Sequence, residues 1–214
     1  MNEWIFDAAA ARFPLREKDP GEFALIRGKG MLFRVRLFEA PGTGSLCLMD
    51  MNAFGGLMKM ETAVFSPTGR DGPLFSTDLI EAAGKDTLLL ELYDTTASHP
   101  DFAALDEVRA RWAWLPAHDP GEHWYDHLRL PVSDFKAGKG LLPGVADYAH
   151  DYARAYFAQL EACPLCDESE KKRLNAVYTD GMLENGGPAV NQFCKMIGRE
   201  KTAEFLRRCM FCAE

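Results

Sequence analysis

Two acidic side chains lie in the most apolar part of the sequence. Glu61 interrupts an apolar run over residues 57–65, and Asp78 follows the segment Pro73-Leu-Phe-Ser-Thr. Burial disfavours the charged form of a carboxyl group, so a carboxyl among apolar neighbours holds its proton near neutral pH and can deliver it. Two such groups close together strengthen the effect. The alternative is structural, with Glu61 paired to Lys59 on a solvated strand face and Asp78 capping a turn.

Four of the six cysteines form two Cys-x-x-Cys pairs. They are Cys163 with Cys166 and Cys209 with Cys212. Four thiolates can hold a zinc ion or an iron–sulfur cluster if two such pairs meet in space. Both pairs are near the expected ends of helices, which permits such a meeting. Unliganded thiols are the alternative.

Other chemical motifs are missing or incomplete in the sequence. There is no phosphate-binding GxxxxGK[ST] loop, no GxGxxG after a strand and no GxSxG elbow. His123 and His127 are four residues apart but lack the glutamate of a HExxH zinc motif, and we interpret them as loop histidines. Three tyrosines recur every four residues, at 148, 152 and 156. Such a stripe is typical of a helix packed on a core, and Tyr152 is also a candidate for lining an apolar pocket.

The first hundred residues show the two-residue period of β-strands. Short Gly-containing turns between the strands favour antiparallel pairing, since a parallel return needs a dozen residues or more. Within one expected strand, Met58, Met60 and Thr62 share a face, while Glu61 and Ala63 point the other way. Strands are expected at residues 33–37, 45–51, 57–65, 74–80 and 87–93.

The second half of the chain has helical periodicity. A loop rich in proline and glycine is expected at residues 116–143. Strands followed by helices indicate an α+β fold, with helices packed on an antiparallel sheet, and no linker divides residues 1–214 into two domains. Helices are expected at residues 101–114, 145–162, 169–183 and 188–210.

Charge and hydropathy exclude several classes of function. The 214 residues contain 24 Lys and Arg against 32 Asp and Glu, a net charge of −8, which argues against general binding of nucleic acids or of anionic lipid. No apolar run approaches the roughly 20 residues of a membrane span, and the first residues lack a basic leader. We therefore expect a cytoplasmic protein whose thiols stay reduced.

The most distinctive stretch resembles a known family. Residues 57–78, ending in Gly-Pro-Leu-Phe-Ser-Thr-Asp, resemble the signature of the ferredoxin-dependent bilin reductases, in which a strand leads through a proline-containing loop to Leu-Pro-Leu-Phe-Gly-x-Asp. The run Leu89-Leu-Glu-Leu is similar to that family's next strand, with a glutamate where an aspartate is usual. Tyr178, Asn185, residues 196–205 and residues 210–211 also resemble the family, so the likeness covers roughly residues 30–96 and 170–212.

The resemblance implies a fold and a reaction. The fold would be a three-layer α-β-α sandwich whose central antiparallel sheet and C-terminal helices enclose a linear tetrapyrrole such as biliverdin. The reaction would be the reduction of a pigment double bond, a CH–CH oxidoreduction that proceeds by radical steps. Electrons would come from reduced ferredoxin or flavodoxin and protons from pocket side chains, with no permanently bound cofactor.

The resemblance also assigns roles to particular residues. Asp78 matches the family's central catalytic aspartate. Glu61 falls where one member has a catalytic histidine and the related red chlorophyll catabolite reductases have a glutamate. Asn185 matches a polar position in the pocket lining. The pigment's propionates need cations, for which Arg34 and Arg36, on one face of the first strand, are candidates.

The sequence also contains a candidate basic surface patch, and it leaves two alternative functions open. Arg199, Lys201, Arg207 and Arg208 are candidates for a patch that receives an acidic ferredoxin, and an ordinary solvated helix face is the alternative. Because a fold does not fix a function, a non-catalytic tetrapyrrole carrier is one alternative to the reductase. The other is a protein with a structural or redox metal site at the two cysteine pairs.

Overall fold

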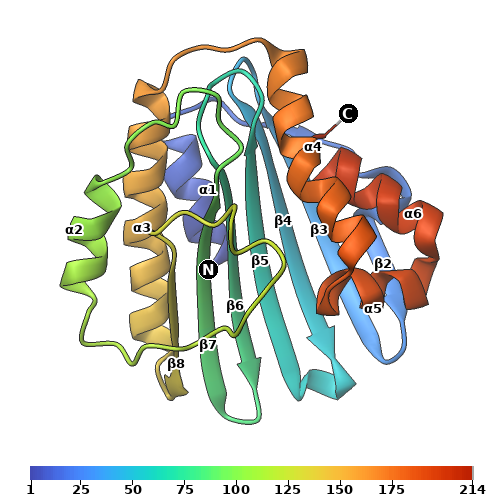
Figure 1. Ribbon diagram of the computed structural model, residues 1–214. Coiled ribbons are helices and arrows are strands. Elements are labelled where there is room, and N and C mark those ends of the chain that lie inside the picture. The colour runs from blue at the N-terminus through green and yellow to red at the C-terminus, as the bar shows by residue number, and fades with distance from the viewer. Residues whose placement is uncertain (214) are drawn as a thin grey trace.

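A single antiparallel sheet forms the middle layer of the molecule (Figure 1). The computed structural model describes residues 1–213, apart from the side chain of Pro188. Within this range eight strands pair in the order β1-β3-β4-β5-β6-β7-β8, with β2 also paired to β3. The strands are β1 (Arg16–Lys18), β2 (Leu25–Gly28), β3 (Met31–Ala40), β4 (Gly44–Ala53), β5 (Met58–Pro67), β6 (Leu74–Ala82), β7 (Lys85–Tyr93) and β8 (Asp134–Lys139).

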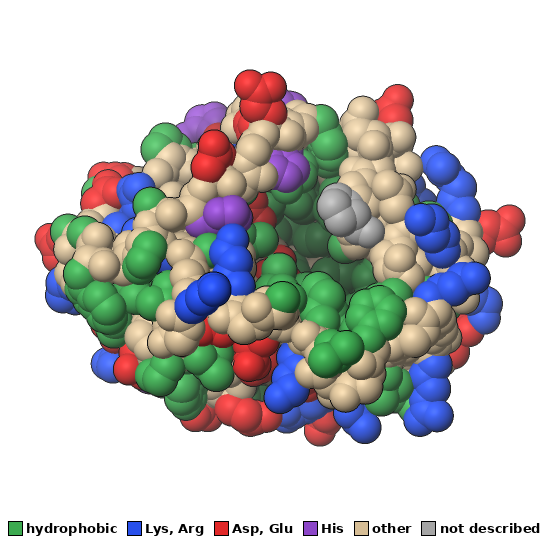
Figure 2. All heavy atoms as spheres, turned by 90° about the horizontal axis from the view of Figure 1, so that it is seen from below, with side chains coloured by type: hydrophobic (Ala, Val, Ile, Leu, Met, Phe, Trp, Pro, Cys, Tyr) green, Lys and Arg blue, Asp and Glu red, His purple; other side chains and the backbone are tan. Residues whose placement is uncertain are grey.

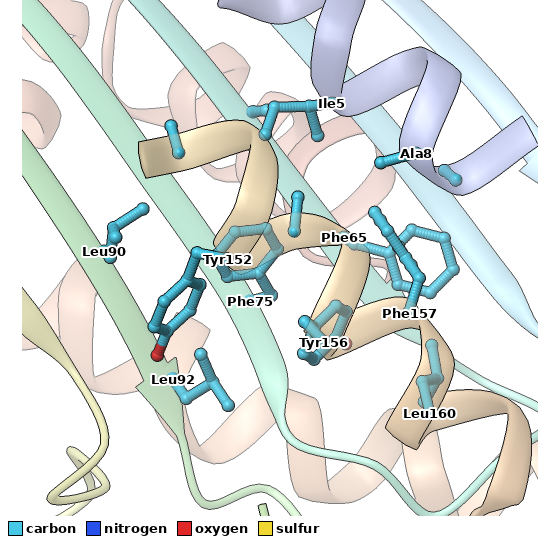
Figure 3. Close-up of a cluster of buried hydrophobic side chains, with 14 of the residues drawn as sticks. Ile5, Ala8, Phe65, Phe75, Leu90, Leu92, Tyr152, Tyr156, Phe157 and Leu160 are labelled. Carbon is cyan, nitrogen blue, oxygen red and sulfur yellow. The ribbon is translucent and has the colours of Figure 1, made fainter. Parts of the chain in front are cut away.

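Three helices cover one face of this sheet. They are α1 (Asn2–Ala10), α2 (Ala104–Arg111) and α3 (Leu142–Ala162), of which α1 and α2 both pack against α3. Figure 3 shows the core beneath α3, where Tyr156 and Phe157 meet Phe65 and Phe75 of the sheet. These four side chains are fully buried, so this face is closed to solvent along the central strands.

The C-terminal helices cover the opposite face and complete the three layers (Figure 1). They are α4 (Glu168–Asn185), α5 (Pro188–Ile197) and α6 (Arg199–Glu204), and one π-helical segment, Phe205–Met210, follows α6. Their core joins Phe193 and Phe205 to Phe33 and Val64 of the sheet. The structure confirms the predicted α+β sandwich with its central antiparallel sheet.

Most of the predicted elements are present. The five predicted strands correspond to β3–β7, and three of the predicted helices correspond to α2, α3 and α4. The predicted helix over residues 188–210 is wrong as one element, because Gly198, with φ of +85°, separates α5 from α6. Helix α1 and strands β1, β2 and β8 were not predicted. The apolar alternation of β8 is limited to Phe135 and Ala137, and its pairing to β7 holds it extended.

Among the described helices, none combines the length and the apolar character needed to cross a bilayer.

A buried lysine fixes α4 to the rest of the fold. Lys171 is 1% exposed, and its ammonium group donates hydrogen bonds to the carbonyl oxygens of Gly72 (2.7 Å) and Thr95. Burial lowers the pKa of Lys171 to about 8. One turn further along α4, the Asn175 amide donates to the carbonyl of Pro67 at 3.0 Å. The helix is therefore tied to the ends of β5 and β7, which sets its height above the sheet.

We predict that Lys171→Met lowers the free energy of unfolding by about 2–4 kcal/mol, because two buried carbonyl oxygens lose their donor. Urea denaturation measures the change. Lys172→Met is the matched control, since Lys172 forms only an i,i+4 surface ion pair with Glu168 and should cost less than about 1 kcal/mol. Equal losses for the two variants would contradict this role for Lys171.

Candidate active site

The two predicted acids lie on opposite faces of the sheet. In the antiparallel pairing of β5 with β6, Thr62 lies opposite Asp78 and Glu61 lies opposite Leu79. Directly paired residues share a face, and neighbours along a strand alternate between faces. Asp78 therefore faces the layer of α4–α6, whereas Glu61 faces α1. The expectation that Glu61 and Asp78 meet in one pocket is wrong.

Glu61 instead holds the start of helix α1. Its Oε2 atom accepts a hydrogen bond from the backbone amide of Asn2 at 2.7 Å and one from the amino group of Met1 at 2.8 Å. The first amides of a helix have no partner within the helix, and a negative charge beside them is stabilising. Glu61 thus has a structural role, although not the predicted pairing with Lys59.

The face that carries Asp78 opens into a hollow with an apolar floor. Figure 2 shows this hollow from the end of the molecule where the β4–β5 and β6–β7 hairpins turn. On the face of Asp78 the middle and far parts of β6 and β7 are half-buried, whereas Leu74, Glu91 and Tyr93 at the other end of these strands are buried. The half-buried floor consists of Met58, Met60, Ser76, Asp78, Ile80, Thr87, Leu89, Phe135 and Ala137.

Asp78 lies in the middle of this floor. Burial raises the pKa of its carboxyl, and a hydrogen bond donated by the Thr62 hydroxyl partly offsets that rise. The side chain keeps some contact with solvent, as the hollow allows. Asp78 can therefore stay protonated at a higher pH than an ordinary aspartate. It can deliver this proton to a molecule in the hollow and take up another from water.

A second carboxyl, Glu91, faces the same side of the sheet. In the pairing of β6 with β7, Asp78 lies opposite Leu89 and Ser76 lies opposite Glu91, so the two acids are diagonal neighbours. The pKa of Glu91 is raised to about 7, chiefly by burial and in smaller part by the charge of Asp78, while a hydrogen bond from Tyr93 and the charge of Arg129 act to lower it. The Nε atom of Arg129 is 3.2 Å from Glu91 Oε1.

Aromatic side chains build one end of the site. Tyr93 at the end of β7 stacks on Tyr178 of α4, with ring centroids 4.0 Å apart, and Tyr125 meets both rings edge-on. Trp124 also stacks on Tyr178 and lies over Gly181, where a Cβ atom would come within 2.4 Å of the indole ring. The loop over residues 116–133 can approach α4 this closely only because position 181 is a glycine.

The predicted arginines do not belong to this site. Arg34 and Arg36 lie on the face of β3 that is turned toward α1, away from Asp78. Arg36 donates to Glu3 of α1 at 2.8 Å, with its guanidinium group over the ring of Phe38. Both were predicted to bind the propionates of a pigment, and that prediction is wrong for a pigment lying beside Asp78, because the sheet separates them.

Tyr152 does not have its predicted role, whereas that of Asn185 stays a prediction. Tyr152 is fully buried in the core beneath α3 (Figure 3), and its hydroxyl donates to the Val132 carbonyl at 2.9 Å. It is a packing residue and cannot line the hollow. Asn185 is exposed at the last position of α4, and its side-chain amide donates to the Gly181 carbonyl at 3.0 Å. A contact between Asn185 and a substrate stays a prediction.

The two cysteine pairs lie apart. Cys163 belongs to the core beneath α3, and Cys209 belongs to the core beneath α4–α6, on the other side of the sheet. Across residues 1–213, no three His, Cys, Asp or Glu side chains come together as a metal would require. A shared site formed by Cys163, Cys166, Cys209 and Cys212 is therefore wrong. Burial raises the pKa of the Cys209 thiol to about 11, so it stays protonated.

Three of the four residues of the predicted basic patch are paired with neighbouring acids. Lys201 pairs with Glu22, Arg208 pairs with Glu204, and Arg207 pairs with Asp180 at 2.8 Å. Arg199 donates to the carbonyl of Leu183 at 3.1 Å. These residues do not form a surface of uncompensated positive charge, and they fit the alternative of a solvated helix face.

Two residues of the site, Glu91 and Arg129, were not among the predicted ones. Glu91 had a usable signal, because an acid inside the apolar strand Leu89-Leu-Glu-Leu is the same pattern that singled out Glu61. No sequence pattern points to Arg129, because it lies in a loop and comes close to Glu91 only in the folded structure.

The fold resembles that of an enzyme solved with a bound pigment. Tomato phytochromobilin synthase in complex with biliverdin superposes with a TM-score of 0.72 at 15% sequence identity, and the match covers 99% of this chain and 82% of that chain. No family model matches the sequence, and a sequence search of curated proteins gives no match. The likeness confirms the fold that the resemblance to bilin reductases implied.

We predict that Glu61→Gln lowers the free energy of unfolding by about 1 kcal/mol, because the first turn of α1 loses a negative charge. Thermal or urea unfolding measures the loss. Glu17→Gln, on the exposed strand β1, is the control and should change stability by less than about 0.5 kcal/mol. An unchanged stability of Glu61→Gln would contradict the assigned role.

Proposed function

We propose that this protein is an oxidoreductase that reduces a double bond of a linear tetrapyrrole such as biliverdin. The observation that carries the proposal is the position of Asp78, a carboxyl of raised pKa on the apolar floor of the hollow. The fold that holds this residue resembles that of an enzyme solved in complex with biliverdin. The resemblance of residues 57–78 to the bilin-reductase signature supports the same reading.

The walls of the hollow suit a flat conjugated ligand. Its floor offers Met58, Met60 and Leu89, and methionines adapt their shape to irregular apolar ligands. Aromatic rings of Trp124 and Tyr125 stand at one end. A mostly apolar site with a few polar groups of defined position is typical of pockets for small organic molecules.

Proton delivery by Asp78 is the chemistry that the site supports. Reduction of one carbon–carbon double bond takes two electrons and two protons. One-electron reduction makes the pigment more basic, so the protonated Asp78 carboxyl can then transfer its proton to it. The resulting carboxylate accepts the hydrogen bond of Thr62 and regains a proton from water in the hollow.

The electrons come one at a time from an external carrier. The resemblance implies reduced ferredoxin or flavodoxin, and it implies no permanently bound cofactor in this chain. The net charge is −8, and Lys201 of α6 and Arg208 of the π-helical segment are paired with acids, so these residues give little electrostatic attraction to an acidic carrier. The docking surface for the carrier therefore lies elsewhere in this proposal.

Mixing the protein with biliverdin and then with reduced ferredoxin tests the proposal. A shift of the pigment absorption on mixing reports binding, and a second change after ferredoxin is added reports reduction. The product is identified by mass, since each reduced double bond adds two hydrogen atoms. A stable bound spectrum with no further change would contradict the reductase and favour a non-catalytic tetrapyrrole carrier.

We predict that Asp78→Asn retains biliverdin binding but lowers the rate of reduction by about 10²-fold or more, because the amide cannot donate an acidic proton. Single-turnover absorption kinetics with reduced ferredoxin measure the rate. Glu61→Gln is the matched control, an acid of the neighbouring strand on the opposite face, and it should keep the parental rate. Reduction by Asp78→Asn at the parental rate would show that Asp78 is not the proton donor.

A further inference from the structure

We infer that Glu91, held in place by Arg129, delivers the second proton of the reduction. The inference rests on the proposed function, because it concerns the same hollow and the same reaction. A reduced carbon–carbon double bond needs two protons, and Asp78 carries one at a time. A second acid on the same face would complete the reaction without a second loading of Asp78 from water.

Glu91 is the second carboxyl that the central strands direct toward the hollow. Strands β5–β8 carry six acidic residues, and the pairing places four of them on the face turned toward α1 and α3. Asp78 and Glu91 remain, as diagonal neighbours on β6 and β7, a relation in which Cα atoms are typically about 7–8 Å apart. The four on the other face are Glu61, Glu81, Asp86 and Asp134.

Arg129 is the ion-pair partner of the Glu91 carboxyl. The Arg129 guanidinium carbon lies 5.2 Å from the ring centre of Tyr125 and 5.0 Å from that of Phe135, so aromatic rings confine it. Its Nη2 atom is 3.1 Å from Asp126 Oδ1, which leaves Nε for Glu91. Two backbone hydrogen bonds anchor the surrounding loop to the chain at the end of β7, from Asp94 to the Leu128 carbonyl (2.7 Å) and from Leu130 to the Leu92 carbonyl (2.8 Å).

The charges around Glu91 suit an acid that must both hold and release a proton. Burial raises its pKa to about 7, so a large part of the population is protonated near neutral pH. Once the proton has left, the carboxylate is stabilised by the positive charge of Arg129. The other titratable groups that influence it are Asp78 on β6, Tyr93 on its own strand, Tyr125 on the loop and Tyr178 on α4.

The reduction of one double bond takes two electrons and two protons. The double bond accepts two electrons from two molecules of reduced ferredoxin, one proton from the Asp78 carboxyl and one from the Glu91 carboxyl. The products are a saturated CH–CH bond, two oxidised ferredoxins and two carboxylates. Both carboxylates then take up protons from water.

The pH dependence of single-turnover reduction of biliverdin by reduced ferredoxin tests the inference. In the parental protein the rate should fall as the pH rises through about 7, because the Glu91 carboxyl then loses its proton to solvent and can no longer donate it. Glu91→Gln should lower the rate by about 10²-fold and abolish this fall, and Glu91→Asp should restore part of the rate. Mass analysis should find that Glu91→Gln forms less of the product that has gained two hydrogen atoms per turnover.

Arg129→Gln separates proton delivery from a structural role. Loss of the positive charge raises the pKa of Glu91, so the fall in rate should move to higher pH. Arg36→Gln is the matched control, because Arg36 lies on the opposite face of the sheet and pairs with Glu3, and the fall should stay in place. A side-chain carbon-13 NMR titration of the pigment-free proteins should show the same order of Glu91 pKa values.

Three results overturn the inference. One is a Glu91→Gln variant with the parental rate and pH profile, which leaves the proposed function standing. Another is an Arg129→Gln variant that loses rate while the pH of the fall and the NMR titration of Glu91 stay unchanged. The third is a parental protein that reduces no bilin, which removes the proposed function together with the inference.

Discussion

Antiparallel pairing between β5, β6 and β7 determines which chemical groups can act together in this protein. A shift of this register by one residue would exchange every side chain between the two faces. The observed register places Thr62 beside Asp78 and puts Glu91 diagonal to it, all on one face. It sends Glu61 to the other face, where it holds α1. The site is thus a consequence of strand pairing more than of any local motif.

The two outer layers give the two faces of the sheet different properties. The layer of α1–α3 closes the central strands with aromatic packing around Phe65, Phe75 and Tyr156, which are fully buried beneath α3. The layer of α4–α6 is attached through Lys171 and Asn175 near one end of the strands. At the other end the floor of β5–β8 stays half-exposed, and the hollow opens there. Asp78 lies between the covered end and the open end of these strands, and it therefore contacts both apolar side chains and solvent.

Much of the fold was predictable because its signals are local. The two-residue period of residues 58–63 correctly separates Met58, Met60 and Thr62 from Glu61 and Ala63. The relation of that strand to the next depends on the turn over residues 68–73, and no pattern in those residues reports it. The pairing of Glu61 with Asp78 was therefore wrong although the period within the strand was right.

The rest of the site depended on which layer covers which face. Arg34 and Arg36 alternate as predicted, but helix α1, which was not predicted, covers their face. Tyr152 lies on a predicted helix, and its amphipathic pattern carries no information about the face on which that helix packs. Cysteine spacing likewise predicts local pairs and not whether two pairs meet, and the sheet keeps Cys163 and Cys209 apart.

A crystal structure of the protein with bound biliverdin tests the central claim most directly. The account predicts a pigment lying on the floor formed by β5–β8, with the Asp78 carboxyl within hydrogen-bonding distance of a pyrrole ring and with Glu91 and Arg129 at its edge. A pigment bound on the α1–α3 side of the sheet, near Glu61 and Arg36, would contradict it.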